Sequence, residues 1–253
     1  MKLAITRCAL FAALAMLVTS AGIAQAQIQP EPVPGYAGNI DAVPVGIDKT
    51  PAPSVPLALV TIYDNTASAA NFGFASNDPA AVFGDELLTT GTGILSTHKL
   101  SIYNSSGSAG PLLTATVNVS FYNFTTSALL GSYNTNVNFG AGLNPGQFAT
   151  ITVTGIDPLL ISLNVTDIAV LQTITAKTGT ATSLGIASRN PPTIGSSPIT
   201  MYINALTVGP AGFYTITSGG NTLPANPVNQ VVINDTPVPV TRGTWGRIKQ
   251  MYR

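Results

Sequence analysis

The chain has 253 residues, of which ten are Lys or Arg, ten are Asp or Glu, one is His and one is Cys. These residue types supply most general bases, nucleophiles and metal ligands, so the composition argues against most enzymes and against a zinc site. We therefore expect a protein that is not an enzyme and that needs no organic cofactor.

The first 26 residues have the three parts of a secretory signal peptide. Lys2 and Arg7 provide a positive start, residues 8–18 are apolar, and residues 24–26 (AQA) form a small-x-small cleavage site. The apolar run is shorter than the roughly 20 residues of a membrane-spanning helix. We expect a secreted or cell-surface protein, bacterial in type, with no disulfide and no transmembrane helix after cleavage.

Proline and charge divide the rest of the chain into three regions. Residues 27–56 contain seven prolines, which favour extended backbone and predict a linker. Residues 57–234 form the predicted domain, and residues 235–253 form a proline-interrupted link to a basic tail. Between residues 27 and 241, ten acidic residues outnumber four basic ones. The domain therefore lacks the basic surface that nucleic acid binding requires.

The domain shows the two-residue period of strands with one buried face. In residues 113–122, apolar residues from Leu113 to Phe121 alternate with polar ones from Thr114 to Ser120 and with Tyr122. This pattern predicts an all-β fold, an antiparallel β-sandwich of jelly-roll type with about nine or ten strands, with a closed barrel as the alternative. The other predicted strands cover residues 57–63, 93–103, 129–139, 148–154, 213–217 and 228–233.

One segment changes its alternation phase. Ile161 and Leu163 share one parity, whereas Ile168 and Val170 fall on the other. The phase change predicts a bulge or bend near Asp167, which would let the chain pass from one sheet to the other.

A few residues could carry chemistry or bind a ligand. His98 shares the parity of Leu100 and is expected to be a structural or surface histidine. Calcium prefers oxygen ligands, and the nearest group of carboxylates is Asp78, Asp85 and Glu86. A sugar-binding platform would use aromatic rings, for which the candidates are Tyr103, Phe121, Tyr122, Phe124, Tyr133 and Phe139, although Phe121 and Phe139 follow the buried parity.

The C-terminal tail concentrates the remaining chemistry of the chain. Its last twelve residues hold four basic side chains and the only tryptophan. Thr244 is a suitable N-cap, and the apolar residues that follow lie three and four positions apart, which predicts a short helix that docks on a partner or an anionic surface. A disordered solubilising end is the alternative. The predicted sorting or docking residues are Thr244, Trp245, Arg247, Ile248, Lys249, Tyr252 and Arg253.

Four motifs resemble the opening of bacterial secreted β-sandwich domains that carry surface-sorting tails, such as the PEP-CTERM and choice-of-anchor groups. The similarity covers about residues 57–139, and it implies no catalytic residue. The tail departs from the PEP-CTERM pattern, because no membrane helix follows the prolines at 237 and 239. The motifs are YDNT at 63–66, FGDELL at 83–88, GTGIL at 91–95 and KLSIYN at 99–104.

These observations favour a non-enzymatic secreted or cell-surface protein with a structural or adhesive role. Its tail would be a sorting or docking signal for a cell-surface or secretion component. The alternative is a carbohydrate-binding module that contacts polysaccharide, and a secreted hydrolase is the weaker form of that alternative. If the protein binds a metal, we expect calcium.

Overall fold

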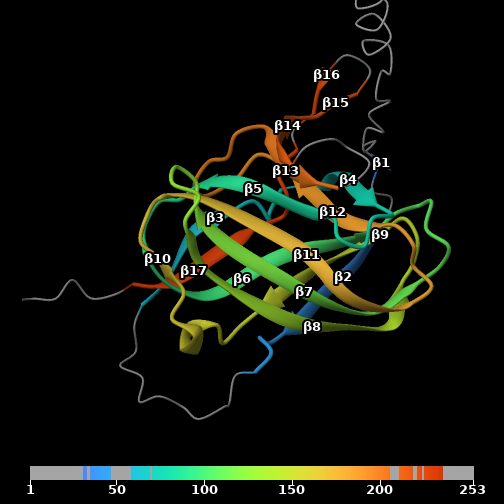
Figure 1. Ribbon diagram of the computed structural model, residues 1–253, viewed down its shortest axis with the longest axis horizontal. Helices are drawn as coiled ribbons and strands as arrows, with labels where there is room; N and C mark the ends of the chain where they lie inside the picture. The colour runs from blue at the N-terminus through green and yellow to red at the C-terminus, as the bar shows by residue number, and fades with distance from the viewer. Residues whose placement is uncertain are drawn as a thin grey trace, which may run out of the picture.

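The computed structural model describes residues 31–32, 35–46, 58–68, 70–205, 211–218, 221–223 and 225–235 (Figure 1). These residues form two facing sheets, a separate two-stranded hairpin and one short 3-10 turn, η1 (Asp157–Leu159). The protein is therefore all-β with the layers of a sandwich, as the alternation predicts. The predicted signal peptide and the basic tail lie outside the described residues.

The nine-stranded sheet is built around the long strand β6. β6 pairs with β9, β10, β12 and β17, and all these pairs are antiparallel. β2 adds to the edge at β9 as the one parallel pairing among the described strands. The strands are β1 (Glu31–Pro32), β2 (Gly35–Ala42), β3 (Leu59–Asp64), β4 (Ala70–Ser76), β6 (Gly93–Asn104), β9 (Gln147–Val153), β10 (Ser162–Leu163), β12 (Leu184–Arg189) and β17 (Gln230–Asn234).

The six-stranded sheet has the order β14-β13-β5-β11-β7-β8. In Figure 1 its strands β11, β7 and β8 lie in front of β6 and β17. A separate small hairpin joins β15 (Thr217–Ser218) to β16 (Asn221–Thr222). The strands of the sheet are β5 (Val82–Leu88), β7 (Leu112–Asn123), β8 (Leu129–Leu143), β11 (Asp167–Gly179), β13 (Thr200–Asn204) and β14 (Gly212–Thr215).

The main core lies between the two sheets. Val117 and Phe121 of β7 belong to the same buried cluster as Leu100 and Ile102 of β6. Along β7, buried residues alternate with half-buried ones from Ala115 onward. The predicted period of two therefore separates an inner apolar face from an outer polar face.

The phase change predicted near Asp167 marks the passage between sheets. Ser162 and Leu163 pair with β6 in the nine-stranded sheet, and the chain pairs from Asp167 onward with β5 in the six-stranded sheet. Leu163 and Ile168 are both fully buried although they differ in parity. The bend between them lets both side chains reach the same core.

Within the region predicted as a linker, residues 31–32 form β1 and residues 35–42 form β2. The prolines of this region flank β2 and leave its eight residues free to donate backbone hydrogen bonds. Beyond β2, Val45 N donates to Asn134 O over 2.7 Å and Thr135 Oγ1 donates to Val43 O over 2.9 Å. This segment therefore connects the edge of one sheet to the edge of the other, and the folded domain begins before residue 57.

Glu31 anchors the start of that segment. Its carboxylate accepts hydrogen bonds from Tyr103 Oη, Ser105 Oγ, and the hydroxyl and amide of Ser106, at 2.7–3.1 Å. Burial alone would raise the pKa of Glu31, but these bonds outweigh it and lower the pKa below its usual value. The charged carboxylate of Glu31 thus accepts the hydrogen bonds that hold β1 against the sheet.

Four further strands, β4, β5, β12 and β13, are not among those predicted from the sequence. β12 is buried at five of its six residues, so it has no polar face to reveal a period. Gly185 of β12 allows close strand pairing, because a Cβ at this position would lie 1.7 Å from Phe74 O.

We predict that Gly185→Ala lowers the free energy of unfolding by about 3 kcal/mol, because the methyl group forces β12 away from β4. Gly107→Ala is the matched control, since its Cβ would meet only Ser105 Oγ, at 3.7 Å, and it should change stability by less than about 0.5 kcal/mol. Chemical denaturation measures both. Equal stability of the two variants would contradict the close approach.

Candidate functional site

His98 is a buried structural histidine that links the two sheets. Its Nδ1 accepts from Tyr133 Oη of β8 at 2.7 Å, and its Nε2 donates to Asn229 Oδ1 at 3.0 Å. This tautomer is assigned from the two partners. Burial lowers the pKa of His98 to about 4, although the bond to Asn229 raises it in part. Both ring nitrogens are occupied in a fully buried site, so the inward parity leads to a structural role.

Asp85 is a fully buried carboxylate on the inner face of β5. Its Oδ1 accepts from Ser197 Oγ at 2.9 Å, and Asn226 Nδ2 donates to the same Ser197 oxygen. Asp85 Oδ2, Asn226 Oδ1 and Tyr63 Oη are buried with no hydrogen-bond partner among the described residues. Burial raises the pKa of Asp85 well above its usual value, and the Ser197 bond offsets this only in part. The surroundings of the carboxyl group therefore favour its neutral form over its charged form.

The three calcium candidates do not lie on one face. Asp85 points into the core, whereas Glu86 lies half-buried on the opposite face of β5. Burial and the charge of Asp167 raise the pKa of Glu86. Asp78 lies in the β4–β5 loop, where its Oδ1 accepts from Ala80 N at 2.9 Å. Within the described ranges, no group of three His, Cys, Asp or Glu side chains is placed to hold a metal ion.

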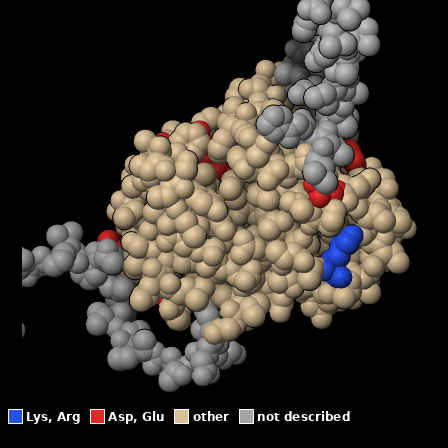
Figure 2. Space-filling model, viewed as in Figure 1, with Lys and Arg blue, Asp and Glu red and all other residues tan. Residues whose placement is uncertain are grey.

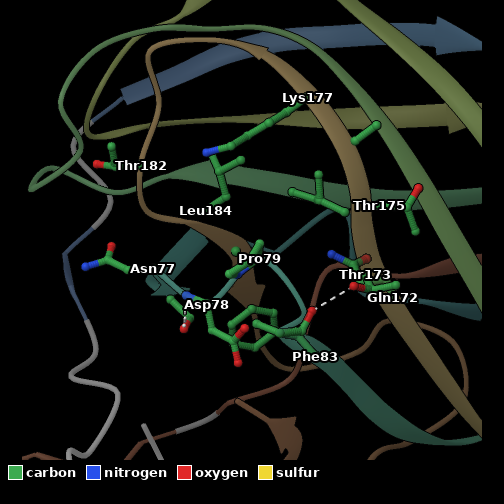
Figure 3. Close-up of a pocket in the computed structure, with 15 residues that line it drawn as sticks. Asn77, Asp78, Pro79, Phe83, Gln172, Thr173, Thr175, Lys177, Thr182 and Leu184 are labelled. Atoms are coloured by element: carbon green, nitrogen blue, oxygen red, sulfur yellow. Dashed lines mark hydrogen bonds between the residues drawn. The ribbon is translucent and has the colours of Figure 1, made fainter. Parts of the chain in front are cut away.

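A cavity of about 120 Å³ opens where β11 runs past the start of β5. Phe83, Ile174 and Leu184 contribute its apolar lining. Figure 3 shows Lys177 above the cavity and the hydrogen bond from Thr173 to the Ala81 carbonyl, 2.9 Å long, below it. The volume is well below the roughly 300 Å³ of ordinary ligand pockets. The cavity can hold a few waters or a very small molecule.

The outer face of the six-stranded sheet carries a regular uncharged array, which we call the neutral face. It covers four rows across β11, β7 and β8, and no position in it is charged. Figure 2 views this side of the molecule and shows a broad expanse without acidic or basic atoms, with charged groups toward the margins. The rows are Leu171–Ser120–Ser132, Thr173–Asn118–Asn134, Ala176–Thr116–Asn136 and Thr178–Thr114–Asn138.

Side chains of the neutral face are bonded to one another across the strands. Asn118 Nδ2 donates to Asn134 Oδ1 at 2.9 Å, and Thr116 Oγ1 donates to Asn136 Oδ1 at 2.8 Å. The hydroxyls of Thr114 and Thr178 lie 2.6 Å apart. These bonds restrict the rotamers, so the face presents hydroxyl and amide groups in fixed positions before any ligand arrives.

An aromatic cluster, which consists of Phe124, Tyr202 and Phe213, extends the same face toward β14. Tyr202 pairs with Gly84 and with Phe213 in register, and Gly84 pairs with Leu171 of the neutral face. The ring centroids of Phe124 and Phe213, and of Tyr202 and Phe213, lie 5.3 Å apart in edge-on geometry. All three rings are half-buried.

The structure separates the six aromatic candidates. Tyr103, Phe121 and Tyr133 are buried, and Phe139 packs against the core. Tyr122 and Phe124 remain half-buried. The other two rings of the aromatic cluster, Tyr202 and Phe213, were not predicted from the sequence. The alternation in TMYIN at 200–204, with Met201 and Ile203 buried, is the signal that could have placed Tyr202 on the outer face.

Comparison with known proteins gives no match: no family model, no curated protein and no solved structure matches the chain. The resemblance to sorted surface domains therefore stays a prediction. Within the part of the chain that the structure describes, no helix is long and apolar enough to cross a membrane.

We predict that Asp85→Asn stabilises the protein at neutral pH. A raised folded-state pKa means that stability is full below the unfolded pKa of about 3.9 and is lost as pH rises through the folded pKa. The amide of Asn carries no charge at any pH, so this loss of stability is absent from the variant. The free energy of unfolding at pH 7 should rise by at least about 1.4 kcal/mol, the equivalent of one pKa unit.

Denaturant titrations of both proteins between pH 4 and pH 8 measure this effect. The difference in stability should grow with pH, which separates Asp85 from other groups that titrate identically in both proteins. A constant difference in stability, or an Asp85→Asn variant that is less stable at every pH, would contradict the raised pKa of Asp85.

Proposed function

We propose that the chain is a non-enzymatic secreted or cell-surface protein with a structural or adhesive role, and that it attaches through the neutral face. The observation that carries this proposal is the size and regularity of an uncharged, pre-ordered array of hydroxyl and amide groups on one side of the sandwich. Binding to such a surface depends little on ionic strength, because no long-range charge pairs are involved.

A function carried out by side chains in the interior of the domain has less support. The single histidine has both ring nitrogens bonded inside the core, and the Asp85 carboxyl is fully buried. Neither residue is among those that line the 120 Å³ cavity. The groups that remain available for a partner are therefore those of the outer surface.

The jelly-roll class and the sorting tail belong to the same proposal. Successive strands from β4 to β7 alternate between the two sheets, which supports jelly-roll connectivity. The tail is argued from sequence, because its residues lie outside the described ones. A chain with a single tryptophan places it among four basic residues at the end, as expected for a docking or sorting segment.

Charge placed on the neutral face should release the protein from the cell surface. Asn134→Asp with Asn136→Asp keeps both acceptor oxygens for Asn118 and Thr116 but adds two charges that a ligand must desolvate. We expect the ratio of cell-bound to released protein to fall about tenfold, which corresponds to 1.4 kcal/mol. Fractionation of expressing bacteria followed by immunoblotting measures the ratio.

The control adds the same charge elsewhere. Asn144→Asp with Asn164→Asp changes two exposed residues outside the neutral face, and it should leave the cell-bound fraction unchanged. Equal retention of the two double variants, with equal melting temperatures, would argue against attachment through this face.

Deletion of residues 241–253 should change where the protein accumulates while the domain stays folded. The deleted segment contains the predicted sorting or docking residues and none of the described strands. We expect the truncated protein to shift from the cell-bound fraction to the medium with an unchanged melting temperature. An unchanged distribution would remove the tail from the proposal.

A further inference from the structure

We propose that the neutral face and the adjoining aromatic cluster form one binding surface for a neutral polysaccharide chain. This inference rests on the proposed function and names the ligand class of the same surface. The two components lie on one side of the six-stranded sheet and share a row, which runs from Phe213 and Tyr202 through Gly84 to Leu171 and Ser120.

The row changes from apolar to polar along its length. Phe213 and Tyr202 present ring surfaces at one end, and Leu171 leans over Gly84, because a Cβ on Gly84 would lie 2.3 Å from Leu171 Cδ2. Beyond Leu171, the row continues with hydroxyls on β7 and β8. A sugar ring presents C–H groups on its faces and hydroxyls around its rim, so it can use both ends of this row.

The hydrogen-bonding groups of the neutral face suit an uncharged partner. Thr116 donates its one hydroxyl proton to Asn136 and keeps its oxygen as an acceptor. Asn134 and Asn136 each use a side-chain oxygen in the bonds across the strands, and their NH₂ groups keep donor capacity. Sugar hydroxyls both donate and accept, so they match a surface that offers both functions without charge.

Other macromolecules fit this surface less well. Nucleic acids and acidic polysaccharides need basic groups, whereas the neutral face has none and Glu86 lies beside it on β5. The central part of a protein interface is usually apolar and rich in aromatic residues and arginine. Here only Leu171 and Ala176 among the array residues are apolar. The charge and the polarity together favour a neutral glycan.

The geometry also favours an extended ligand over a small one. Neighbouring strands are about 4.8 Å apart, so the three strands of the array and the three beyond them offer a continuous surface rather than an enclosed pocket. The cavity near Lys177 has a volume of only about 120 Å³, although Thr173 and Ala176 of the neutral face are among its lining residues. A polymer that lies along the sheet gains contacts from many sugar units, each of them weak.

Adsorption of the full chain to insoluble polysaccharides tests the inference. The neutral probes are crystalline cellulose, chitin and insoluble starch, and the acidic probe is calcium alginate beads. We expect saturable adsorption to at least one neutral probe, with affinity unchanged when the salt concentration is raised. No adsorption to any of the three neutral probes, or tighter adsorption to alginate than to all of them, would overturn the inference.

Two variants test the two halves of the surface separately. Tyr202→Ala with Phe213→Ala removes the rings, and Asn134→Asp with Asn136→Asp adds charge to the array while it keeps the cross-strand bonds. Each should weaken adsorption about tenfold or more. Tyr36→Ala is the control, because Tyr36 is 51% exposed on β2 of the other sheet, and it should bind like the parent chain. Adsorption that neither double variant weakens would place the ligand elsewhere and overturn the inference.

The adsorption test still decides between the outcomes if one variant folds poorly. The melting temperature of each variant is measured first, and the Asn double variant alone decides the matter if loss of the rings unfolds β13. Retention on cells that depends on the neutral face, without adsorption to the neutral probes, would refute the ligand class and keep the proposed function. Adsorption to a neutral probe, without retention on cells, would support the ligand class and refute the proposed function.

Discussion

The pairing register of β7, β8 and β11 is the constraint on which both the core and the binding surface depend. Val117, Val119 and Phe121 fill the space between the sheets, and every residue between them must therefore face outward. A slip of one residue would bury Asn118 and Thr116 and expose the core. The hydrophobic effect thus fixes the positions of polar groups that it does not itself bury.

Buried polar groups add a second layer of constraint. His98 connects β6 to Tyr133 and Asn229, and Asn229 N donates in turn to Asn65 Oδ1 at 2.8 Å. The ring is desolvated, so loss of Tyr133 or of Asn229 would leave one nitrogen of His98 without its hydrogen-bond partner in the core. The network makes the relative position of the two sheets specific, whereas apolar contacts alone would tolerate small shifts.

The same groups shape the dependence of stability on pH. His98 has a folded-state pKa of about 4, so its contribution is lost as pH falls from about 6.5 toward 4. The lowered pKa of Glu31 acts in the same direction in acid. Asp85, whose pKa is raised, acts in the opposite direction as pH rises. His98 and Glu31 therefore favour stability at higher pH, and Asp85 favours stability at lower pH.

Alternation predicts the strands that have one wet face and fails for those that do not. β6, β7, β8, β9 and β17 follow from the sequence because polar residues separate their buried ones, and the passage between sheets follows from the change of parity around Asp167. β12 has no wet face, and the prolines around β2 conceal a strand that they only flank. The aromatic cluster depends on the pairing of β13 with β5 and β14, which local sequence does not encode.

Nuclear magnetic resonance of the asparagine side-chain amides tests the central claim most directly. Titration with a soluble neutral oligosaccharide should shift the NH₂ signals of Asn134, Asn136 and Asn138 and leave those of the buried Asn65 and Asn104 unchanged. Shifts confined to Asn77 beside the cavity, or no shifts at concentrations that saturate adsorption, would contradict a role for the neutral face.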